Sequence, residues 1–363
     1  MIEPRFSPTL CRLVAAAASL VCLHGSASAL TNHEIATYNG ADRQKVLEDG
    51  ARKEGKVVLY STSGAEAVLV PWKAAFEKKY PFLTLDYWRA GPETVTKAMS
   101  EFQANTHTGD VTEWGEGTLA MKNAKALEAF YSPEIAKYAA DAKDPDGFWA
   151  ASRVSYFGTG YNSDLVKPQD VPKTYADLAD PRYKGKMAWK LTTGTGARLF
   201  TTAMRKLMGE DGADAFMKKL AAQNIANYSG SAVALVDQVA RGEYPLALQI
   251  FAQDPLRLKA KGAPSDTIMM DPTIGTLGTV QMLTGAPHPY ATMLFIDFVL
   301  SKEGQDIVQK AGYFSANPDS PPVDAFRSIV PNLIHMKIYM AGPEEAFAEE
   351  DKSQKILDKY FSY

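Results

Sequence analysis

Strand-like runs and helical patterns alternate along most of this 363-residue chain. Residues 56–60 and 83–88 are rich in β-branched and aromatic side chains, which favours strands. A helical pattern follows each run, over residues 65–80 and 92–105. Because each strand is followed by a helix, the pattern predicts a parallel sheet covered by helices, which is an α/β fold.

A second series of the same kind begins at residue 185. Residues 185–189 and 246–251 predict strands, and residues 197–208 and 211–222 predict helices. A further helix is expected near the start, over residues 31–54. With 46% hydrophobic residues, the chain can bury two cores. We therefore expect two α/β units with a cleft between them.

The first 29 residues have the pattern of a secretory signal peptide. Arg5 and Arg12 precede an apolar run over residues 13–23, and Ala27-Ser28-Ala29 follows as a cleavage site. The run is shorter than the ~20 apolar residues that span a bilayer. The residues before Cys22 lack the small side chains of a lipoprotein site. We therefore predict cleavage of the segment and export to the periplasm.

Cysteine usage argues against a disulfide-stabilised fold, and net charge argues against a nucleic-acid-binding protein. Cys11 and Cys22 both lie in the predicted signal peptide, so the exported protein is expected to fold without disulfides. The chain has 39 basic and 42 acidic residues, a net charge of −3. Because this balance gives no positive excess, we expect no nucleic-acid partner.

Three loops place small or hydroxylated residues between a predicted strand and the following helix. Free backbone N–H groups at a helix start, together with hydroxyl donors, can bind an anion or a carboxylate. In open α/β sheets, ligands lie beyond the carboxyl ends of the strands, where these loops are expected. Helix capping explains any one loop equally well, whereas three loops together favour a site. The candidate ligand-binding residues in these loops are Ser61, Thr62, Ser63, Thr195, Gly196, Tyr228, Ser229 and Ser231.

Further candidates lie at or near predicted strand ends. Arg89 directly follows the strand over residues 83–88, where a guanidinium can clamp an acid, although a surface ion pair is an equal alternative. Aromatic side chains can form the walls of a site, but most of them belong to cores. The candidate ligand-binding residues of this second group are Arg89, Trp114, Glu116, Gln249 and Phe251.

The common catalytic and cofactor motifs are missing. The sequence has no P-loop, no H-E-x-x-H and no G-x-S-x-G, and no cysteine follows the predicted signal peptide. His33, His107, His288 and His335 are scattered without metal-ligand spacing. We therefore predict a binding protein rather than an enzyme, with no cofactor and no bound metal.

Several motifs resemble periplasmic solute-binding proteins of ABC transporters, in the branch that includes the ferric-iron-binding proteins. Residues 88–111 carry Arg89, two glutamates and then Asp110-Val111, similar to a stretch of that family. Residues 161–186 end in D-P-R-Y-K-G-K, which is similar to another family segment. Residues 241–243 and 287–305 complete a resemblance that covers nearly the whole exported chain.

The resemblance implies a type II periplasmic-binding fold. Such a fold has two α/β lobes, each a mainly parallel sheet flanked by helices, joined by crossing hinge strands. We place the first lobe at residues 30–130 plus 275–315 and the second at residues 131–274 plus 316–363. The resemblance also implies a monomer that closes over a small-molecule ligand and delivers it to an ABC transporter permease in the inner membrane.

The sequence departs from the ferric-binding members. These offer a histidine soon after the first strand and adjacent tyrosines after a later strand, because Fe³⁺ prefers phenolate and carboxylate oxygens. Residues 61–64 have no histidine and residues 249–253 have no tyrosine, which favours a small anionic or polar organic solute. Two alternatives stay open. One is a ferric-ion or metal-chelate binding protein with Glu113, Glu116 or Tyr228 as ligands, and the other is a periplasmic enzyme with Glu116 near a histidine.

Overall fold

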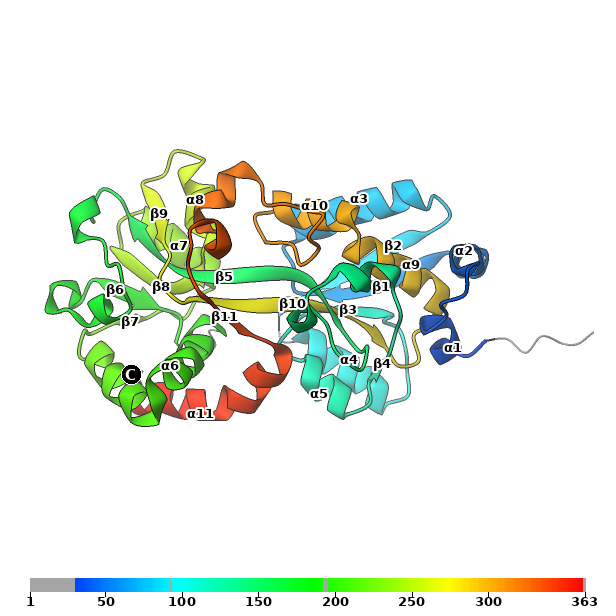
Figure 1. Cartoon of the computed structure of the whole chain (residues 1–363), viewed down its shortest axis with the longest axis horizontal. Helices are drawn as coiled ribbons and strands as arrows, with labels where there is room; N and C mark the ends of the chain where they lie inside the picture. Colours follow the sequence, from blue (N-terminus) through cyan, green and yellow to red (C-terminus); the bar gives the residue numbers. More distant parts are fainter. Residues whose placement is uncertain (1–29, 92, 192–194, 362–363) are drawn as a thin grey trace, which may run out of the picture. The chain divides into compact units, whose positions relative to one another are not determined.

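The computed structural model of the chain describes residues 30–91, 93–191 and 195–361 (Figure 1). Its helices are α1 (Asn32–Ala36), α2 (Arg43–Glu54), α3 (Val70–Lys79), α4 (Glu93–Gln103), α5 (Thr118–Asn123), α6 (Thr195–Ala221), α7 (Ala232–Ala240), α8 (Gln253–Lys259), α9 (Pro289–Leu300), α10 (Lys302–Lys310) and α11 (Pro343–Phe361). Its strands are β1 (Lys56–Ser61), β2 (Thr84–Arg89), β3 (Val111–Glu113), β4 (Leu127–Glu128), β5 (Ala150–Asn162), β6 (Met187–Trp189), β7 (Ala226–Asn227), β8 (Leu246–Phe251), β9 (Ser265–Ile268), β10 (Thr273–Leu283) and β11 (Ile338–Ala341).

The first sheet is built from β2, β1 and β3, which lie parallel in that order, and from β10, which is antiparallel to β3. Helix α3 connects β1 to β2, and α4 connects β2 to β3. The strand–helix alternation predicted for residues 56–105 is therefore confirmed. Ser61 and Glu113 are partners at the carboxyl ends of β1 and β3, so the loops after both strands meet at one edge of the sheet.

The second sheet contains β8, β6 and β7, which lie parallel in that order, and β5, which is antiparallel to β8. The strands predicted over residues 185–189 and 246–251 are confirmed as β6 and β8. Helix α6 connects β6 to β7, and α7 connects β7 to β8. The second sheet therefore repeats the strand–helix order of the first.

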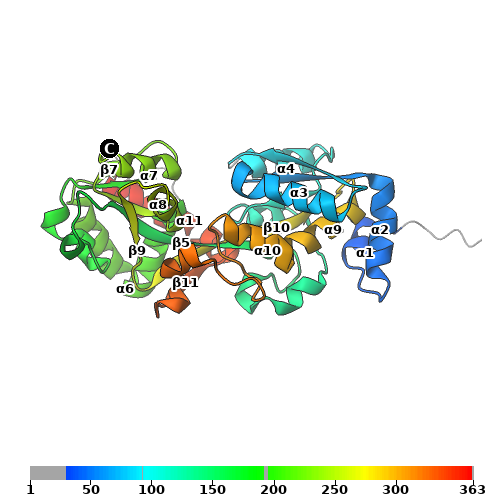
Figure 2. The ribbon, with the colours of Figure 1, turned by 90° about the horizontal axis from the view of Figure 1, so that it is seen from above.

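Strands β5 and β10 run from one sheet into the other (Figures 1 and 2). Residues 150–156 of β5 pair with β10, and residues 157–162 pair with β8 and β9. Strand β10 pairs in turn with β11, β5, β3 and β4. The prediction of two α/β units joined by crossing strands is confirmed.

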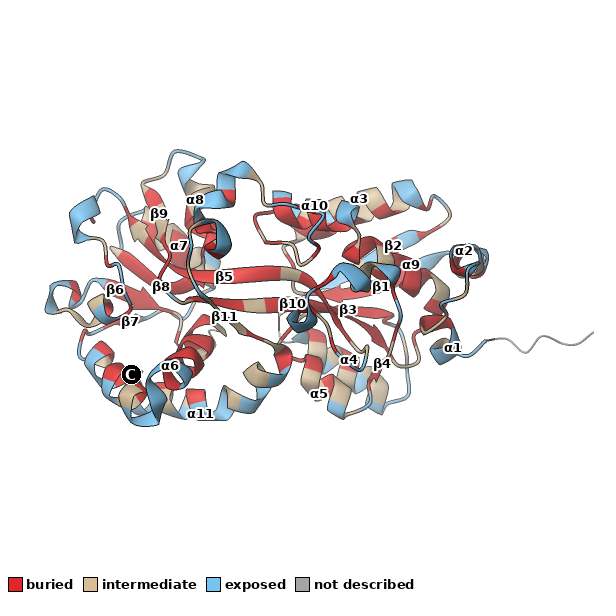
Figure 3. Ribbon diagram, viewed as in Figure 1, coloured by how far each residue is buried: buried red, intermediate tan, exposed pale blue. Residues whose placement is uncertain are grey.

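Each sheet has its own hydrophobic core, and most residues of β5, β8 and β10 are buried (Figure 3). In the first core, the rings of Trp72 and Phe76 pack edge to face on Phe295, with centroid distances of 6.3 and 5.2 Å. In the second core, Trp189 packs edge to face on Phe200 at 5.3 Å. Burial of such side chains contributes about 1.5–3 kcal/mol each, so each unit is stabilised on its own side of the crossing strands.

Packing assigns several connecting segments to one core or the other. Trp149 and Phe326 pack in the first core, whereas Leu357 and Phe361 of α11 pack in the second. The residue ranges assigned to the two lobes from the sequence remain a prediction.

The prediction of one continuous helix over residues 31–54 is wrong. Helix α1 ends at Ala36, the backbone N–H of the following residue, Thr37, closes the last turn, and α2 begins only after Asp42. The Tyr38 hydroxyl donates to the Asp42 carboxylate over 2.7 Å, which stabilises the non-helical connection between the two helices.

Helix α6 joins the two helices that were predicted over residues 197–208 and 211–222. Gly209 forms a kink between the two segments of α6, with φ 73° and ψ 169°, a conformation that is essentially restricted to glycine.

No helix among the described residues combines the length and the apolar character needed to cross a bilayer.

Candidate functional site

A cavity of about 250 Å³ lies beside β5 and β10, with walls from both sheets. The loops after β1 and β3 contribute one side, and the start of α6 and the end of β8 contribute the other. The cavity suits a small solute. Its lining residues are Thr62, Gly91, Trp114, Gly115, Glu116, Arg153, Ser155, Thr195, Phe251, Thr276, Leu277, Gly278 and Tyr313.

The loops after β1 and β3 reach the cavity because these two strands are parallel neighbours. Thr62 directly follows β1, and its backbone N–H donates to the Glu113 carbonyl at the end of β3. Trp114 directly follows β3, and its backbone N–H donates to the Thr279 carbonyl of β10 over 2.9 Å. These backbone bonds fix both loops against the sheet.

The crossing strands present alternate residues to the cavity. Arg153 and Ser155 of β5 lie opposite Gly278 and Thr276 of β10, and all four line the cavity. Because side chains of a strand alternate between its faces, residues two apart share one face. The floor therefore carries a guanidinium and two hydroxyl groups.

Arg153 supplies the positive charge of the cavity. Its Nη1 donates to the carboxylate of Glu113 and to the Ser63 hydroxyl (2.8 Å), and its Nη2 lies 3.3 Å from Thr62 Oγ1. Burial lowers the pKa of Arg153, but an arginine stays protonated at neutral pH. Glu113 is fully buried, so only the guanidinium of this ion pair faces the cavity.

Aromatic rings form another part of the wall. The Phe251 ring stacks on Phe157 with a centroid distance of 5.1 Å, and Tyr313 packs edge to face on Phe251 at 6.4 Å. The guanidinium of Arg153 lies 5.4 Å from the centre of the Tyr313 ring. Flat apolar surfaces beside a charged donor suit an organic molecule that carries an anionic group.

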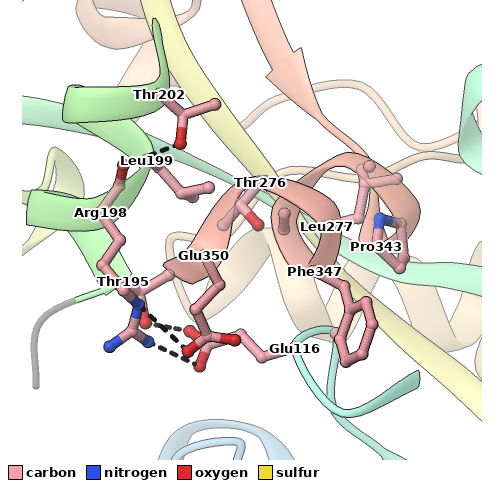
Figure 4. Close-up of a pocket in the computed structure, with 13 residues that line it drawn as sticks. Glu116, Thr195, Arg198, Leu199, Thr202, Thr276, Leu277, Pro343, Phe347 and Glu350 are labelled. Carbon is pink, nitrogen blue, oxygen red and sulfur yellow. Dashed lines mark hydrogen bonds and ion pairs between the residues drawn. The ribbon is translucent and has the colours of Figure 1, made fainter. Parts of the chain in front are cut away.

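Glu116 joins the loop after β3 to helix α6 (Figure 4). The Thr195 hydroxyl donates to one carboxylate oxygen, and Arg198 Nη2 lies 3.3 Å from the other. Arg198 Nε lies 3.5 Å from Glu350 of α11. Burial raises the pKa of Glu116, and the Thr195 hydrogen bond and the Arg198 charge oppose this shift.

A second hollow adjoins these charged groups, on the side where Figure 4 shows Pro343 and Phe347. Its volume of about 20 Å³ leaves room for roughly one water molecule. This second hollow is therefore too small for an organic solute.

The structure brings part of the predicted site together at this cavity. The predicted residues that line it are Thr62, Trp114, Glu116, Thr195 and Phe251. Ser61 and Ser63 lie next to them, but their hydroxyls are buried and donate to Glu113 over 2.7 and 2.9 Å. Residues 192–194 of the second predicted loop lie outside the described residues.

The third predicted loop and Arg89 do not line the cavity. Arg89 is exposed at the end of β2, which is the edge strand of the first sheet. The Ser231 hydroxyl caps α7 by accepting a hydrogen bond from the Ala234 backbone N–H, which is the structural alternative considered above. Tyr228 is half-buried and Ser229 is exposed, and neither belongs to the cavity wall.

Gly196 and Gln249 are buried behind the cavity wall. A Cβ atom at Gly196 would collide with the carbonyl oxygen of Gln249. Gly196 therefore allows α6 to approach β8 closely, and this contact places Thr195 at the cavity.

Sequence reasoning missed eight cavity residues, of which Gly91 and Gly115 lie in the loops after β2 and β3. The other six come from β5, β10 or the segment after α10, and they are Arg153, Ser155, Thr276, Leu277, Gly278 and Tyr313. One signal was present in the sequence: Arg153 is the only charged residue in the run 149–157, which otherwise holds small, apolar and aromatic residues. A lone arginine in such a strand is costly to bury unless it is paired, and it indicates either a structural ion pair or a site.

Among the described residues, no group of three or more His, Cys, Asp or Glu side chains converges to hold a metal ion. Of the described histidines, none lines the cavity, and His288 is paired with Asp110 at 2.9 Å.

Two α/β units with shared crossing strands and a polar cavity at their junction define a solute-binding protein. The sequence pattern of the family described as "Bacterial extracellular solute-binding protein" matches residues 118–328. The chain belongs to this family, and the resemblance found in its sequence is confirmed. An uncharacterized protein of Haemophilus influenzae is 30% identical over 282 residues, which are 73% of this chain and 79% of that protein.

Solved structures show the same fold. The periplasmic binding protein AfuA from Actinobacillus pleuropneumoniae, with exogenous fructose-6-phosphate bound, has a TM-score of 0.70 and 25% identity over 85% of this chain and 98% of AfuA. Iron-bound HitA from Pseudomonas aeruginosa has a TM-score of 0.72 and 19% identity over 84% of this chain and 99% of HitA. The prediction of a two-lobed type II periplasmic-binding fold is confirmed.

Proposed function

We propose that this protein captures a small organic anion in the cavity around Arg153 and delivers it to the permease of an ABC importer. The observation that carries the proposal is the Arg153 guanidinium on a wall that also holds the hydroxyls of Thr62, Ser155 and Thr276. A guanidinium and hydroxyl donors together suit a phosphate or a carboxylate group.

A sugar phosphate is the first solute to test. AfuA, which is 25% identical to this chain, has fructose-6-phosphate bound in its structure. The aromatic rings of Phe251 and Tyr313 offer flat surfaces for the body of such a molecule, next to the Arg153 charge.

Closure over the solute is part of the proposal. Thr62 and Trp114 follow strands of the first sheet, whereas Thr195 and Phe251 belong to elements of the second. A solute that contacts both sets favours the closed arrangement, because it gains interactions there that an open one lacks. The working protein is then a periplasmic monomer without its signal peptide.

The two alternative functions have less support. Glu113 already accepts hydrogen bonds from Arg153 and several serines, and Tyr228 lies outside the cavity, so neither offers a free oxygen ligand to Fe³⁺. An enzyme with Glu116 and a histidine would need that histidine at the cavity, and none of the described ones lines it.

Isothermal titration calorimetry tests the proposal. The titrants are fructose 6-phosphate, neutral fructose, inorganic phosphate, a dicarboxylate panel and Fe³⁺ with and without citrate. We expect binding of at least one organic anion and none of neutral fructose. Tight binding of Fe³⁺ with a charge-transfer colour, and of no organic anion, would contradict the proposal.

A further inference from the structure

Glu113 lies at the centre of a buried hydrogen-bond cluster directly behind Arg153. Its side chain has no exposed surface, so no solute in the cavity can touch it. One carboxylate oxygen accepts from Ser61 Oγ (2.7 Å) and Ser63 Oγ (2.9 Å), and the other accepts from Ser152 Oγ (2.6 Å) and Arg153 Nη1. Any effect of Glu113 on a solute must therefore act through Arg153.

An irregularity in strand pairing directs two consecutive side chains to this carboxylate. Arg153 is opposite Gly278, but Thr279 is opposite Ala151, so Ser152 has no partner on β10. In a regular strand, Ser152 and Arg153 would point to opposite faces. The β-bulge at Ser152 changes this direction, and both side chains reach the same oxygen of Glu113.

Gly278 leaves the space that the guanidinium occupies. A Cβ atom at this position would lie 2.6 Å from Arg153 Cζ and 2.7 Å from Nη1, closer than real contacts allow. These two atoms belong to the far end of a flexible side chain, and the next nearest atom, Arg153 Cγ at 2.8 Å, also belongs to the side chain rather than to backbone. A side chain at position 278 would therefore displace the guanidinium without preventing the fold.

The pairing leaves part of the guanidinium for a solute. Nη1 is shared between Glu113 and Ser63, and Nη2 makes a single 3.3 Å contact with Thr62, while Arg153 lines the cavity with 12% of its side chain exposed. A long arginine side chain normally loses rotamer freedom when it binds an anion. Here that freedom is already lost in the folded protein, so the loss does not weaken binding.

We infer that Glu113 and Gly278 are positioning residues, which fix the Arg153 guanidinium in the orientation that binds the anionic group of the solute. The inference rests on the proposed function for its purpose, whereas the fixed orientation itself does not depend on any ligand. The two claims can therefore be tested separately.

The first test needs no solute and follows the side-chain Nε–Hε signal of Arg153 by NMR. The signal is assigned by its loss in Arg153→Lys. In the native protein, we expect a sharp signal protected from solvent exchange. Gly278→Ala and Glu113→Gln should each shift it and speed its exchange with water. The matched control is Gly64→Ala, whose added Cβ would meet only Ala67 Cβ at 3.8 Å and should leave the signal unchanged. An unchanged Arg153 signal in Gly278→Ala would overturn the inference, even if Glu113→Gln fails to fold.

The second test measures calorimetric affinity for fructose 6-phosphate in a double-mutant cycle. We expect Arg153→Lys and Gly278→Ala each to weaken binding by about tenfold or more, since hydrogen bonds to charged groups are worth that much. The double variant should bind no more weakly than Arg153→Lys alone. Additive losses would mean that Gly278 acts independently of Arg153 and would overturn the inference. Native affinity in Arg153→Lys would instead refute the proposed function, and the NMR result would still decide the fixed orientation.

Discussion

Single residues decide both the charge and the geometry of the cavity. Arg153 is the cation that lines it, and Glu113 neutralises that cation from behind. Removing one partner of a buried pair typically costs 3–5 kcal/mol, because the other charge is left unpaired. A substitution that keeps the charge of Arg153 therefore tests ligand binding with less loss of stability than a substitution that removes the charged side chain.

The first residue-scale prediction compares Arg153→Lys with Arg89→Lys. The lysine at position 153 keeps the charge but loses the planar fork that binds an anion through two hydrogen bonds. We expect affinity for the bound organic anion to fall about tenfold or more. The same change at Arg89, which is exposed at the end of β2, should alter affinity by less than about twofold. Calorimetry measures the affinity of both variants. A larger loss of affinity in Arg89→Lys than in Arg153→Lys would show that Arg89 binds the anionic group.

The second residue-scale prediction concerns acid stability. Burial alone would raise the pKa of Glu101, but hydrogen bonds from Lys97, Thr108 and Tyr60 outweigh it and hold the pKa at about 2. Because this value lies below the unfolded one, the stabilisation is present above about pH 4.5 and is lost as pH falls towards 2.

Glu101→Gln should therefore be less stable to urea at pH 7. Its free energy of unfolding should be lower than that of the native protein by about 1–2 kcal/mol after allowance for solvent screening. The difference from the native protein should shrink as the pH is lowered from 4.5 to 2.5. A difference that stays constant over this range would show that the charge of Glu101 is not the cause.

At the scale of elements, the sequence predicts what depends on local pattern. The β-branched run at residues 56–60 and the mainly apolar run at residues 246–251 are strands because neighbouring residues alone favour that state. The break between α1 and α2 was missed although the turn pair Asn39-Gly40 lies within it.

The binding cavity was predicted less completely because part of it depends on contacts between distant strands. Thr62 and Trp114 follow strands directly, so their place at the sheet edge could be inferred from the strand–helix order. The bulge at Ser152 depends on the register between β5 and β10, which are more than a hundred residues apart in the chain. No local pattern encodes that register, and the direction of Arg153 could not be predicted without it.

One element-scale prediction concerns the break in α6. No heavy atom lies within 4 Å of a Cβ built at Gly209, so a substitution there meets a conformational cost and no steric one. Because φ is 73° and ψ is 169°, Gly209→Ala should destabilise the protein by about 1–3 kcal/mol. Gly64→Ala, at φ −60°, should change stability by less than about 0.5 kcal/mol. Urea unfolding measures both, and equal stability of the two variants would contradict the conformational argument.

At the scale of the whole molecule, the contact between Glu116 and α6 connects elements of the two sheets. Arg198 contributes to this contact and also pairs with Glu350 of α11. Partly exposed ion pairs of this kind are worth up to about 1 kcal/mol, which corresponds to roughly a fivefold change in an equilibrium. The contact therefore biases closure without locking it.

Arg198→Ala should increase the open population of the solute-free protein by up to about fivefold and raise its radius of gyration in small-angle X-ray scattering. Lys359→Ala is the matched control, because Lys359 pairs with Asp214 within α6 and α11 and does not touch the first sheet. An equal change in both variants, or none in either, would show that the Glu116 contact does not affect closure.

The central claim is that the cavity around Arg153 holds a small organic anion. Native mass spectrometry of protein freshly purified from the periplasm of producing cells tests it most directly, since a tightly bound solute is retained. We predict an added mass that releases a phosphate- or carboxylate-bearing fragment, present on the native protein and on Arg89→Lys and lost from Arg153→Lys. An added mass equal to an iron ion, or an organic mass retained equally by Arg153→Lys, would contradict the claim.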